Sequence, residues 1–233
     1  MWNSRTVNEL HTHPKGIAEI PIVEHSGTRR KGWRGSLAMA SILHLSIDRL
    51  TTPIGVLLLV GDEAGRLRAV DWTDYEERMV RLLRLHYGMH GYELAPAHNP
   101  NGLSNKMLRF FAGDLHAIDD IETATAGTPF QRRVWNELRN IPTGSVISYG
   151  KLAQKIGRSS AARAVGLANG SNPIGIVVPC HRVIGSDGAL TGYGGGLERK
   201  RWLLDHEARK AEGLARKESW EDGWVTTRRI MHA

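Results

Sequence analysis

Residues 176–202 read IVVPCHRVIGSDGALTGYGGGLERKRW and carry the most distinctive chemistry of the chain. They contain Cys180, the single cysteine of the 233 residues, placed where an apolar run stops at Pro179 and followed by His181 and Arg182. Nearby positive charge lowers the pKa of a thiol and favours the reactive thiolate, so Cys180 is a candidate nucleophile. On this stretch alone the alternative is a buried cysteine that acts as a small hydrophobe.

The composition is that of an ordinary globular protein, with 41% hydrophobic and 24% charged residues. One cysteine excludes an internal disulfide and a thiolate-rich zinc site, and it fits a reducing compartment. The apolar runs, such as 54–60, are too short to span a bilayer, and the N-terminus lacks the apolar core of a secretory signal. We therefore expect a cytoplasmic protein with no membrane partner.

The formal net charge of +7 is unevenly distributed. Acidic residues outnumber basic ones between positions 41 and 127, whereas between 128 and 208 basic residues outnumber acidic ones by about two to one. This asymmetry suggests that the second region meets a polyanion, with a solvated basic surface as the alternative.

The patterns along the chain predict an α+β protein. Its expected parts are an irregular N-terminal extension at 1–40, an α+β scaffold domain at 41–113, an acidic linker at 114–127, a basic domain at 128–208 and a polar tail at 209–233. Within the scaffold, apolar runs predict strands at 42–47, 54–60 and 67–72 in an antiparallel meander, followed by amphipathic helices at 75–87 and 104–112. The scaffold shows no sign of chemistry.

The basic domain opens with Thr128-Pro129, an N-cap and a first-turn proline that predict a helix ending before Pro142. Two short helices are expected next, at 149–156 and 161–169, the first capped by Ser148 and the second by Ser159 or Ser160. Two short helices joined by a tight turn have the outline of a helix-turn-helix.

The second short helix, AARAVGLAN, is made mostly of small residues. Side chains that read base edges are usually larger and polar, and here only Arg163 and Asn169 are of that kind. Small residues suit close approach to a groove with little sequence preference, and a closely packed core helix is the alternative.

The chain then turns at Asn172 and continues as an apolar strand expected at 174–178. Neighbouring side chains of a strand point to opposite faces, so Cys180 and His181 are expected to communicate through a water unless the chain turns there. A final helix, expected at 197–206, ends at Glu207, whose carboxylate is available to orient a histidine.

Seven motifs occur in a fixed order between residues 128 and 207: TPFQRRVW, GSVISYGKLA, AARAVG, NP, IVVPCHRVIG, GALTGYGGGL and WLLDHE. Together they resemble the DNA O6-alkylguanine alkyltransferases, or methylated-DNA-protein-cysteine methyltransferases. The resemblance implies direct-reversal DNA repair, in which a flipped O6-alkylguanine, or an O4-alkylated thymine, loses its alkyl group irreversibly to Cys180. It also implies a ribonuclease H-like first domain, a winged-helix-like second domain, a monomer, no cofactor and double-stranded DNA as partner.

The same resemblance assigns roles to individual residues. Cys180 would accept the alkyl group, His181 would act as base through a water, and Glu207 would orient His181. Asn172 would be the hinge of the active-site turn, and Tyr149 would offer its hydroxyl to the guanine ring.

Further residues would contact DNA or the flipped base. Arg163 would fill the space that the flipped nucleotide leaves. The other DNA contacts would be Tyr149, Ala162 and Ser160, and the base pocket would be formed by Tyr193, Gly194, Gly195 and Val183.

Two departures from the family pattern have consequences. Some members carry serine where this chain has Gly194, so we expect a pocket that is open to bulkier alkyl groups. Some members hold zinc through N-terminal cysteines, which this chain lacks, so no metal site is expected.

Three other functions remain as alternatives. A binder of alkylated bases without chemistry would not need Cys180. A cysteine hydrolase would leave the helix-turn-helix unexplained. A transcriptional regulator would need polar base-reading side chains on 161–169, where the sequence has few.

Overall fold

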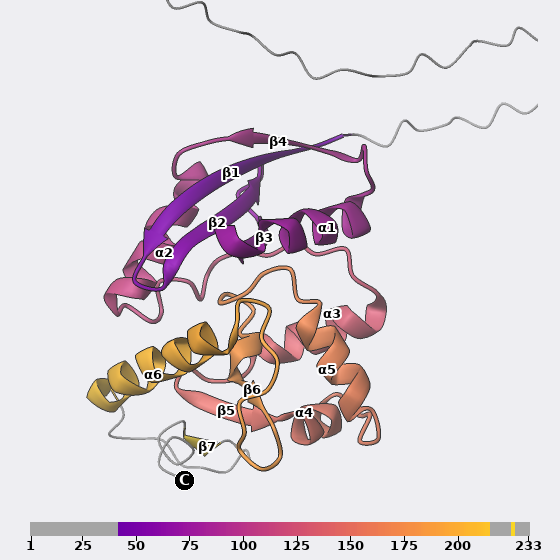
Figure 1. The fold of residues 1–233 in the computed structure, drawn as a ribbon, viewed down its shortest axis with the longest axis vertical. Coiled ribbons are helices and arrows are strands. Elements are labelled where there is room, and N and C mark those ends of the chain that lie inside the picture. Colours follow the sequence, from indigo (N-terminus) through magenta and orange to yellow (C-terminus); the bar gives the residue numbers. More distant parts are fainter. Residues whose placement is uncertain (1–41, 215–224, 227–233) are drawn as a thin grey trace, which may run out of the picture. The chain divides into compact units, whose positions relative to one another are not determined.

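Four strands form a sheet in the first half of the chain (Figure 1). The computed structural model describes residues 42–214 and 225–226, so the predicted extension at 1–40 and most of the predicted tail lie outside the described residues. The sheet has the order β3-β2-β1-β4. Its strands are β1 Leu43–Thr52, β2 Gly55–Asp62, β3 Leu67–Trp72 and β4 Tyr92–Pro96.

The first three strands form the predicted antiparallel meander, which is confirmed. The expectation that this sheet is antiparallel is wrong for its fourth strand, β4, which the sequence did not predict and which pairs parallel with β1. This strand has no buried residue and ends at Pro96, which suits the edge of a sheet and leaves little apolar signal in the sequence.

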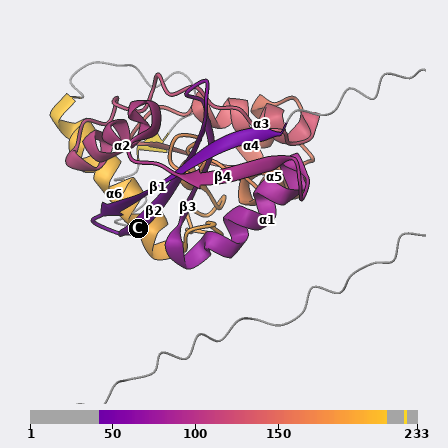
Figure 2. The same ribbon diagram turned by 90° about the horizontal axis from the view of Figure 1, so that it is seen from above.

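Helices cover both faces of this sheet. Neighbouring residues of β2 point to opposite faces, so Leu57 and Leu58 belong to different apolar clusters. Helix α1, Glu76–Tyr87, packs on the Leu58 face, and helix α2, Leu103–Ala112, packs on the Leu57 face. Figure 2 shows the two helices on opposite sides of the strands.

The second half of the chain is mainly helical. Thr128 is the N-cap of the first of these helices, as its sequence predicts, and the structure adds a capping box with Gln131. Ser148 caps the second by accepting a hydrogen bond from the Lys151 amide. The predicted cap at Ser159 or Ser160 is wrong, because the N-cap of the third helix is Ala161 and its side chain accepts no hydrogen bond. The helices are α3 Pro129–Arg139, α4 Tyr149–Lys155, α5 Ala162–Gly170 and α6 Leu197–Leu214.

Helix α6 does not end at Glu207 as predicted but continues to Leu214. Its sequence contains no proline, and its single glycine lies next to its last residue, so nothing stops the helix earlier. Three short strands accompany these helices in the order β6-β5-β7: β5 Ser145–Ser148, β6 Val183–Ile184 and β7 Val225–Thr226. β7 comes from the region predicted as a tail and pairs antiparallel with β5.

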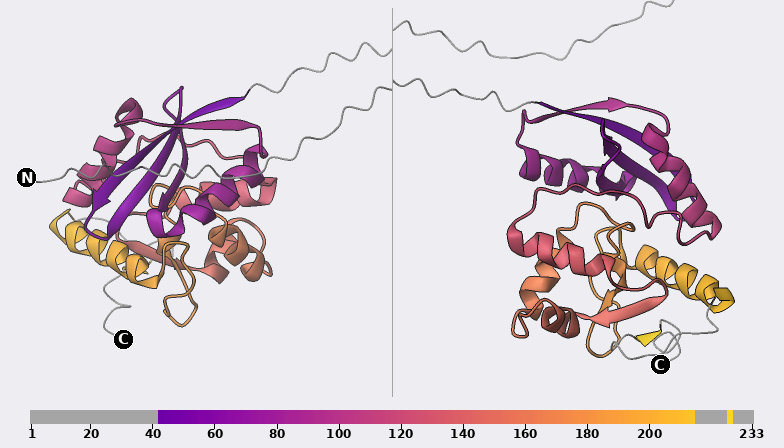
Figure 3. Two further views of the ribbon diagram at one scale, coloured as in Figure 1. Left: turned by 45° about the horizontal axis from the view of Figure 1, so that its top comes forward. Right: turned by 180° about the vertical axis from the view of Figure 1, so that it is seen from behind.

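The edge strand β3 meets the second half of the chain, and β4 lies at the far edge (Figure 3). The Val70 amide donates to the Pro173 carbonyl at 2.9 Å, and His206 Nε2 lies 2.8 Å from the Phe110 carbonyl. All described residues belong to one compact unit, 40–233. Within the described ranges, no helix combines the length and the apolar character needed to cross a membrane.

Candidate active site

The chain before Cys180 is a series of turns and not the strand predicted at 174–178. The Val178 amide donates to the Ile174 carbonyl at 3.0 Å, and Ile176 has a φ of 71° in the left-handed region. The side chain of Asn172 stabilises this path, since its Nδ2 donates to the Val178 carbonyl at 2.8 Å and its Oδ1 accepts from the Ile174 amide at 3.0 Å. Asn172 thus binds the backbone of the segment that leads to Cys180, and its predicted role as a hinge stays a prediction.

Cys180 begins a single turn of 3-10 helix, Cys180–Arg182, so it and His181 do not alternate as they would on a strand. The thiol is 5% exposed, and burial raises its pKa more than a hydrogen bond from Asn172 and the charges of Arg78 and Lys200 lower it. The prediction of a lowered thiol pKa is wrong. Cys180 rests as a neutral thiol, and its activation requires a base.

Glu207 lies behind this turn on α6 and is fully buried. One carboxylate oxygen is 2.9 Å from His181 Nε2, and Arg182 donates to both oxygens at 2.8 and 2.9 Å. The Gly144 amide adds a hydrogen bond at 3.2 Å. Burial would raise the pKa of Glu207, but Arg182 and then His181 outweigh it and hold that pKa well below its usual range. The carboxylate is therefore ionised.

His181 is completely buried, and burial lowers its pKa more than Glu207 raises it. We assign the ring proton to Nε2, because an ionised carboxylate can only accept a hydrogen bond. Nδ1 is then a free acceptor, and among the described residues it has no hydrogen-bond partner. A neutral imidazole with one unprotonated nitrogen, next to a protonated thiol, is the arrangement of a general base.

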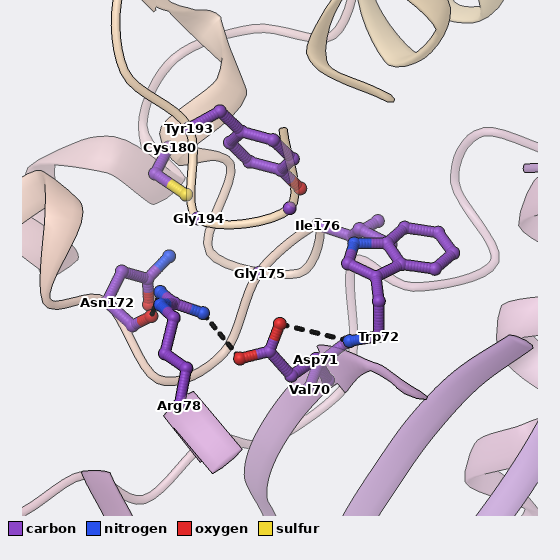
Figure 4. Close-up of a pocket in the computed structure, with 11 residues that line it drawn as sticks. Val70, Asp71, Trp72, Arg78, Asn172, Gly175, Ile176, Cys180, Tyr193 and Gly194 are labelled. Atoms are coloured by element: carbon purple, nitrogen blue, oxygen red, sulfur yellow. Dashed lines mark hydrogen bonds and ion pairs between the residues drawn. The ribbon is translucent and has the colours of Figure 1, made fainter. Parts of the chain in front are cut away.

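A small cavity opens beside Cys180 and joins both halves of the chain (Figure 4). Its volume is about 10 Å³, enough for about one water. The second half contributes Asn172, Gly175, Ile176, Cys180, Tyr193, Gly194 and Gly195, and the first half contributes Val70, Asp71, Trp72 and Arg78.

Five of the predicted site residues thus line the cavity: Cys180, Asn172, Tyr193, Gly194 and Gly195. Burial raises the pKa of Tyr193 well above its usual value, so its hydroxyl remains protonated and able to donate. Val183 is buried nearby but does not line the cavity, and its carbonyl accepts a hydrogen bond from Lys200 at 2.6 Å.

The predicted DNA contacts lie apart from the cavity. Arg163 is exposed on α5, Ser160 is exposed just before that helix, and Ala162 is half-buried at its start. Tyr149 begins α4 and packs beside α5, where a Cβ at Gly166 would lie 3.8 Å from its ring. Tyr149 is not among the residues that line the cavity.

The structure also adds residues that sequence reasoning did not identify. Asp71, Trp72 and Arg78 belong to the half predicted to be a scaffold, and no local pattern marks them. Lys200 stands in a charged run, but it precedes Leu203 and Leu204 by three and four residues, the spacing of a shared helix face. That spacing could have identified Lys200 as buried.

Lys200 is fully buried, and burial lowers its pKa to about 8. Its Nζ donates to the carbonyls of Val183 and Thr191 at 2.6 Å each. These bonds tie the active-site turn, Cys180–Arg182, to the start of the glycine-rich loop at 192–196. In the described part of the chain, no group of three or more His, Cys, Asp or Glu side chains is arranged to hold a metal ion.

The expectation that Gly194 opens the pocket is wrong for this structure. A Cβ at this position would collide with the guanidinium of Arg78. The space that a side chain would occupy is therefore filled by an arginine from the other half of the chain.

A buried Cys180 beside a neutral histidine, with two short helices in the same basic segment, is typical of a cysteine-dependent protein that acts on nucleic acid. Comparison with known proteins places it in a family. A family model described as "6-O-methylguanine DNA methyltransferase, DNA binding domain" matches residues 129–209. A methylated-DNA--protein-cysteine methyltransferase of Shigella flexneri is 59% identical over 166 residues, which cover 71% of this chain and 97% of the relative.

Two solved structures are also similar. The Mycobacterium tuberculosis OGT in complex with DNA has 42% identity and a TM-score of 0.59, with 72% of this chain and 94% of that chain covered. The O6-methylguanine-DNA methyltransferase of Pyrococcus kodakaraensis strain KOD1 has 30% identity and a TM-score of 0.53, with 70% and 98% covered. The chain therefore belongs to the methylated-DNA-protein-cysteine methyltransferase family, as its motifs predict.

Proposed function

We propose that this protein repairs alkylated DNA by direct reversal, moving an alkyl group from O6 of a flipped guanine, or O4 of thymine, to Cys180. The observation that carries the proposal is the buried Glu207–His181 pair, which leaves Nδ1 of a neutral imidazole unpartnered beside the single cysteine. Membership of the methyltransferase family supports the same reaction.

The reaction begins with transfer of the Cys180 proton to His181 Nδ1 through a bridging water. The thiolate attacks the alkyl carbon, an S–C bond forms, the C–O6 bond breaks, and the electron pair of that bond remains with the guanine. The released guanine takes up one proton, which balances the proton that Cys180 lost. Glu207 stays ionised and stabilises the imidazolium while the proton resides on His181.

The product is a thioether, which has no leaving group that water can displace under mild conditions. Each molecule therefore acts once. Tyr193 lines the cavity and its hydroxyl stays protonated, so we assign to it the donation of a hydrogen bond to the guanine oxygen as negative charge develops there. The predicted role of Tyr149 at the ring stays a prediction.

Double-stranded DNA is the proposed partner, bound through α4 and α5. A base inside a duplex is inaccessible to Cys180, so the nucleotide must leave the stack before reaction. Arg163, exposed on a helix of mostly small residues, is proposed to fill the gap with little sequence preference. The M. tuberculosis relative was solved in complex with DNA.

Finer assignments are part of the same proposal. The first half is proposed to be ribonuclease H-like and the second winged-helix-like, with domain boundaries at 113 and 128. The protein is proposed to act as a monomer, in the cytoplasm, where a reducing environment keeps Cys180 reactive.

The test is to incubate the protein with a duplex whose O6-methylguanine carries a labelled methyl group and to locate the label by mass spectrometry. We expect one label per protein, on Cys180, and none in Cys180→Ser. An unmethylated duplex is the control. Repeated turnover would indicate a hydrolase, and binding to the methylated duplex without a labelled protein would indicate a binder, so either result would sink the proposal.

A further inference from the structure

The cavity beside Cys180 is closed by a side chain that comes from the other half of the chain. Arg78 lies on α1 and extends to the cavity, as Figure 4 shows together with Asp71 and Asn172. Its guanidinium lies where a side chain at Gly194 would project. The guanidinium of Arg78 therefore lies between the first half of the chain and the glycine-rich loop, which forms one wall of the cavity.

Three hydrogen bonds hold the guanidinium of Arg78 in place. Nη1 donates to the Asp71 carboxylate at 2.5 Å, and Nη2 donates to the carbonyls of Asn172 and Gly170 at 3.1 and 3.3 Å. Gly170 is the last residue of α5, and carbonyls at the end of a helix lack partners within it. One side chain thus joins β3 to the end of the proposed DNA-binding helix and to the Asn172 hinge.

The available space is too small for the proposed substrate. A cavity of about 10 Å³ holds about one water, and a purine base is many times larger. Much of the lining is backbone or buried side chain, whereas Arg78 has a long unbranched side chain that is 18% exposed. Arg78 can leave by rotating its own side chain, without any movement of the backbone.

We propose that Arg78 is a gate for the base site: in the free protein its guanidinium occupies the space before Cys180, and an entering alkylated base displaces it. This inference rests on the proposed function. On displacement the contacts to Gly170 and Asn172 are lost, while the pair with Asp71 keeps the arginine at the edge of the site. Arg78 thereby determines which molecules reach the thiol, and it does so as a positioning residue that takes no part in bond making.

The gate can be tested without DNA by measuring how fast two thiol reagents of different size modify Cys180 in the free protein. Methyl methanethiosulfonate is the small reagent and N-ethylmaleimide the bulky one. Both react with the thiolate, so a change in the pKa of Cys180 alters both rates alike, whereas steric access alters mainly the bulky one. The ratio of the two rates therefore reports the gate.

In Arg78→Ala we expect the ratio of bulky to small reagent rates to rise by about tenfold, equivalent to a barrier lowered by about 1.4 kcal/mol. Arg81→Ala, an exposed arginine on the same helix, should keep the wild-type ratio. An unchanged ratio in Arg78→Ala would overturn the proposal and assign closure to the glycine-rich loop. These rates do not depend on alkyl transfer from DNA, so they stay informative even if the repair assay fails.

A second variant covers the case in which Arg78→Ala does not fold. Asp71→Asn keeps the shape of the side chain and leaves Arg78 present but without its charged anchor. We expect the ratio of rates to change in the same direction by a smaller factor. A ratio below that of the wild type would contradict the gate, because it would mean that the anchored arginine holds the site open.

Discussion

Each half of the described chain contains a buried carboxylate paired with an arginine, and the two pairs differ. Asp71 and Arg78 are both in the first half, whereas Glu207 and Arg182 are both in the second. Burial raises the pKa of Asp71 despite Arg78, but Arg182 and His181 hold the pKa of Glu207 well below its usual range. Several donors fix the Glu207 carboxylate. Among the described residues, Asp71 accepts from the Trp72 amide at 3.0 Å and from the flexible side chain of Arg78.

This difference corresponds to different tasks. The Glu207 carboxylate is surrounded by Arg182, His181 and the Gly144 amide, so its charge and position are determined by the fold. Asp71 accepts from a guanidinium that is 18% exposed. A rigid pair suits the support of a base, and a pair with one movable partner suits control of access.

The largest effect is expected from breaking the rigid pair. Glu207→Gln removes the charge that orients His181 and leaves Arg182 without its buried partner. Alkyl transfer should slow by about 10³-fold, and unfolding should require about 3 kcal/mol less. Single-turnover kinetics and urea unfolding measure the two quantities. Glu198→Gln, exposed on the same helix, is the control, and equal rates in both variants would remove Glu207 from the reaction.

An intermediate effect is expected at the proposed DNA-binding surface, which lies outside both pairs. Arg163→Ala should slow repair of a methylated duplex by about 10-fold to 100-fold, because the gap left by the flipped nucleotide stays unfilled. Reaction with free O6-benzylguanine should be nearly unchanged, since no flipping is needed. Arg201→Ala, an exposed arginine on α6, serves as control. Equal losses on both substrates would exclude the flipping role.

The two carboxylates should change the stability in opposite directions as the pH is lowered. The pKa of Glu207 is lower in the folded state than the usual 4.5, so its stabilisation is complete above that value and is lost as pH falls below it. The pKa of Asp71 is raised above 3.8, so its contribution is complete below 3.8 and is lost as pH rises through the raised value.

Urea unfolding at pH 7 and at about pH 3.5 tests these signs. The free energy of unfolding of Glu207→Gln should be lower than that of the wild type at pH 7. This difference should shrink by about 1 kcal/mol or more at the lower pH. Asp71→Asn should change in the opposite direction. If both variants lose their deficits at low pH, the contrast between the pairs is incorrect.

The smallest effect is expected from Asp71→Asn at neutral pH. Because burial already disfavours the charged form of Asp71, replacing it by an amide of the same shape should change the unfolding free energy by only about 1 kcal/mol. Thermal unfolding measures this change. A loss as large as that of Glu207→Gln would show that the first pair is as rigid as the second.

Local patterns predicted most of the fold. The meander of β1 to β3, the helices α1 to α4 and the cap at Thr128 follow from apolar periodicity and capping chemistry, which act within a few residues. The same applies to Cys180, His181 and Glu207, which lie in short motifs. Their individual roles stay predictions.

Other features depend on contacts between distant residues. The apolar run at 174–178 has the composition of a strand, but the amide of Asn172 binds its backbone groups and turns it. Arg78 resembles the other arginines of α1 in sequence, and only the fold brings it to the cavity. Such contacts leave no mark in any short stretch of the chain.

The left-handed backbone at Ile176 sets two energies against each other. A β-branched residue with a φ of 71° stores about 1–3 kcal/mol of conformational strain, which glycine would relieve. The Ile176 side chain is only 1% exposed, and its burial contributes about 1.5–3 kcal/mol, which glycine would forfeit along with added chain entropy. The two energies nearly cancel. The strained backbone at Ile176 therefore costs little stability, and replacing Ile176 by glycine would alter the shape of the cavity wall more than it would alter the free energy of unfolding.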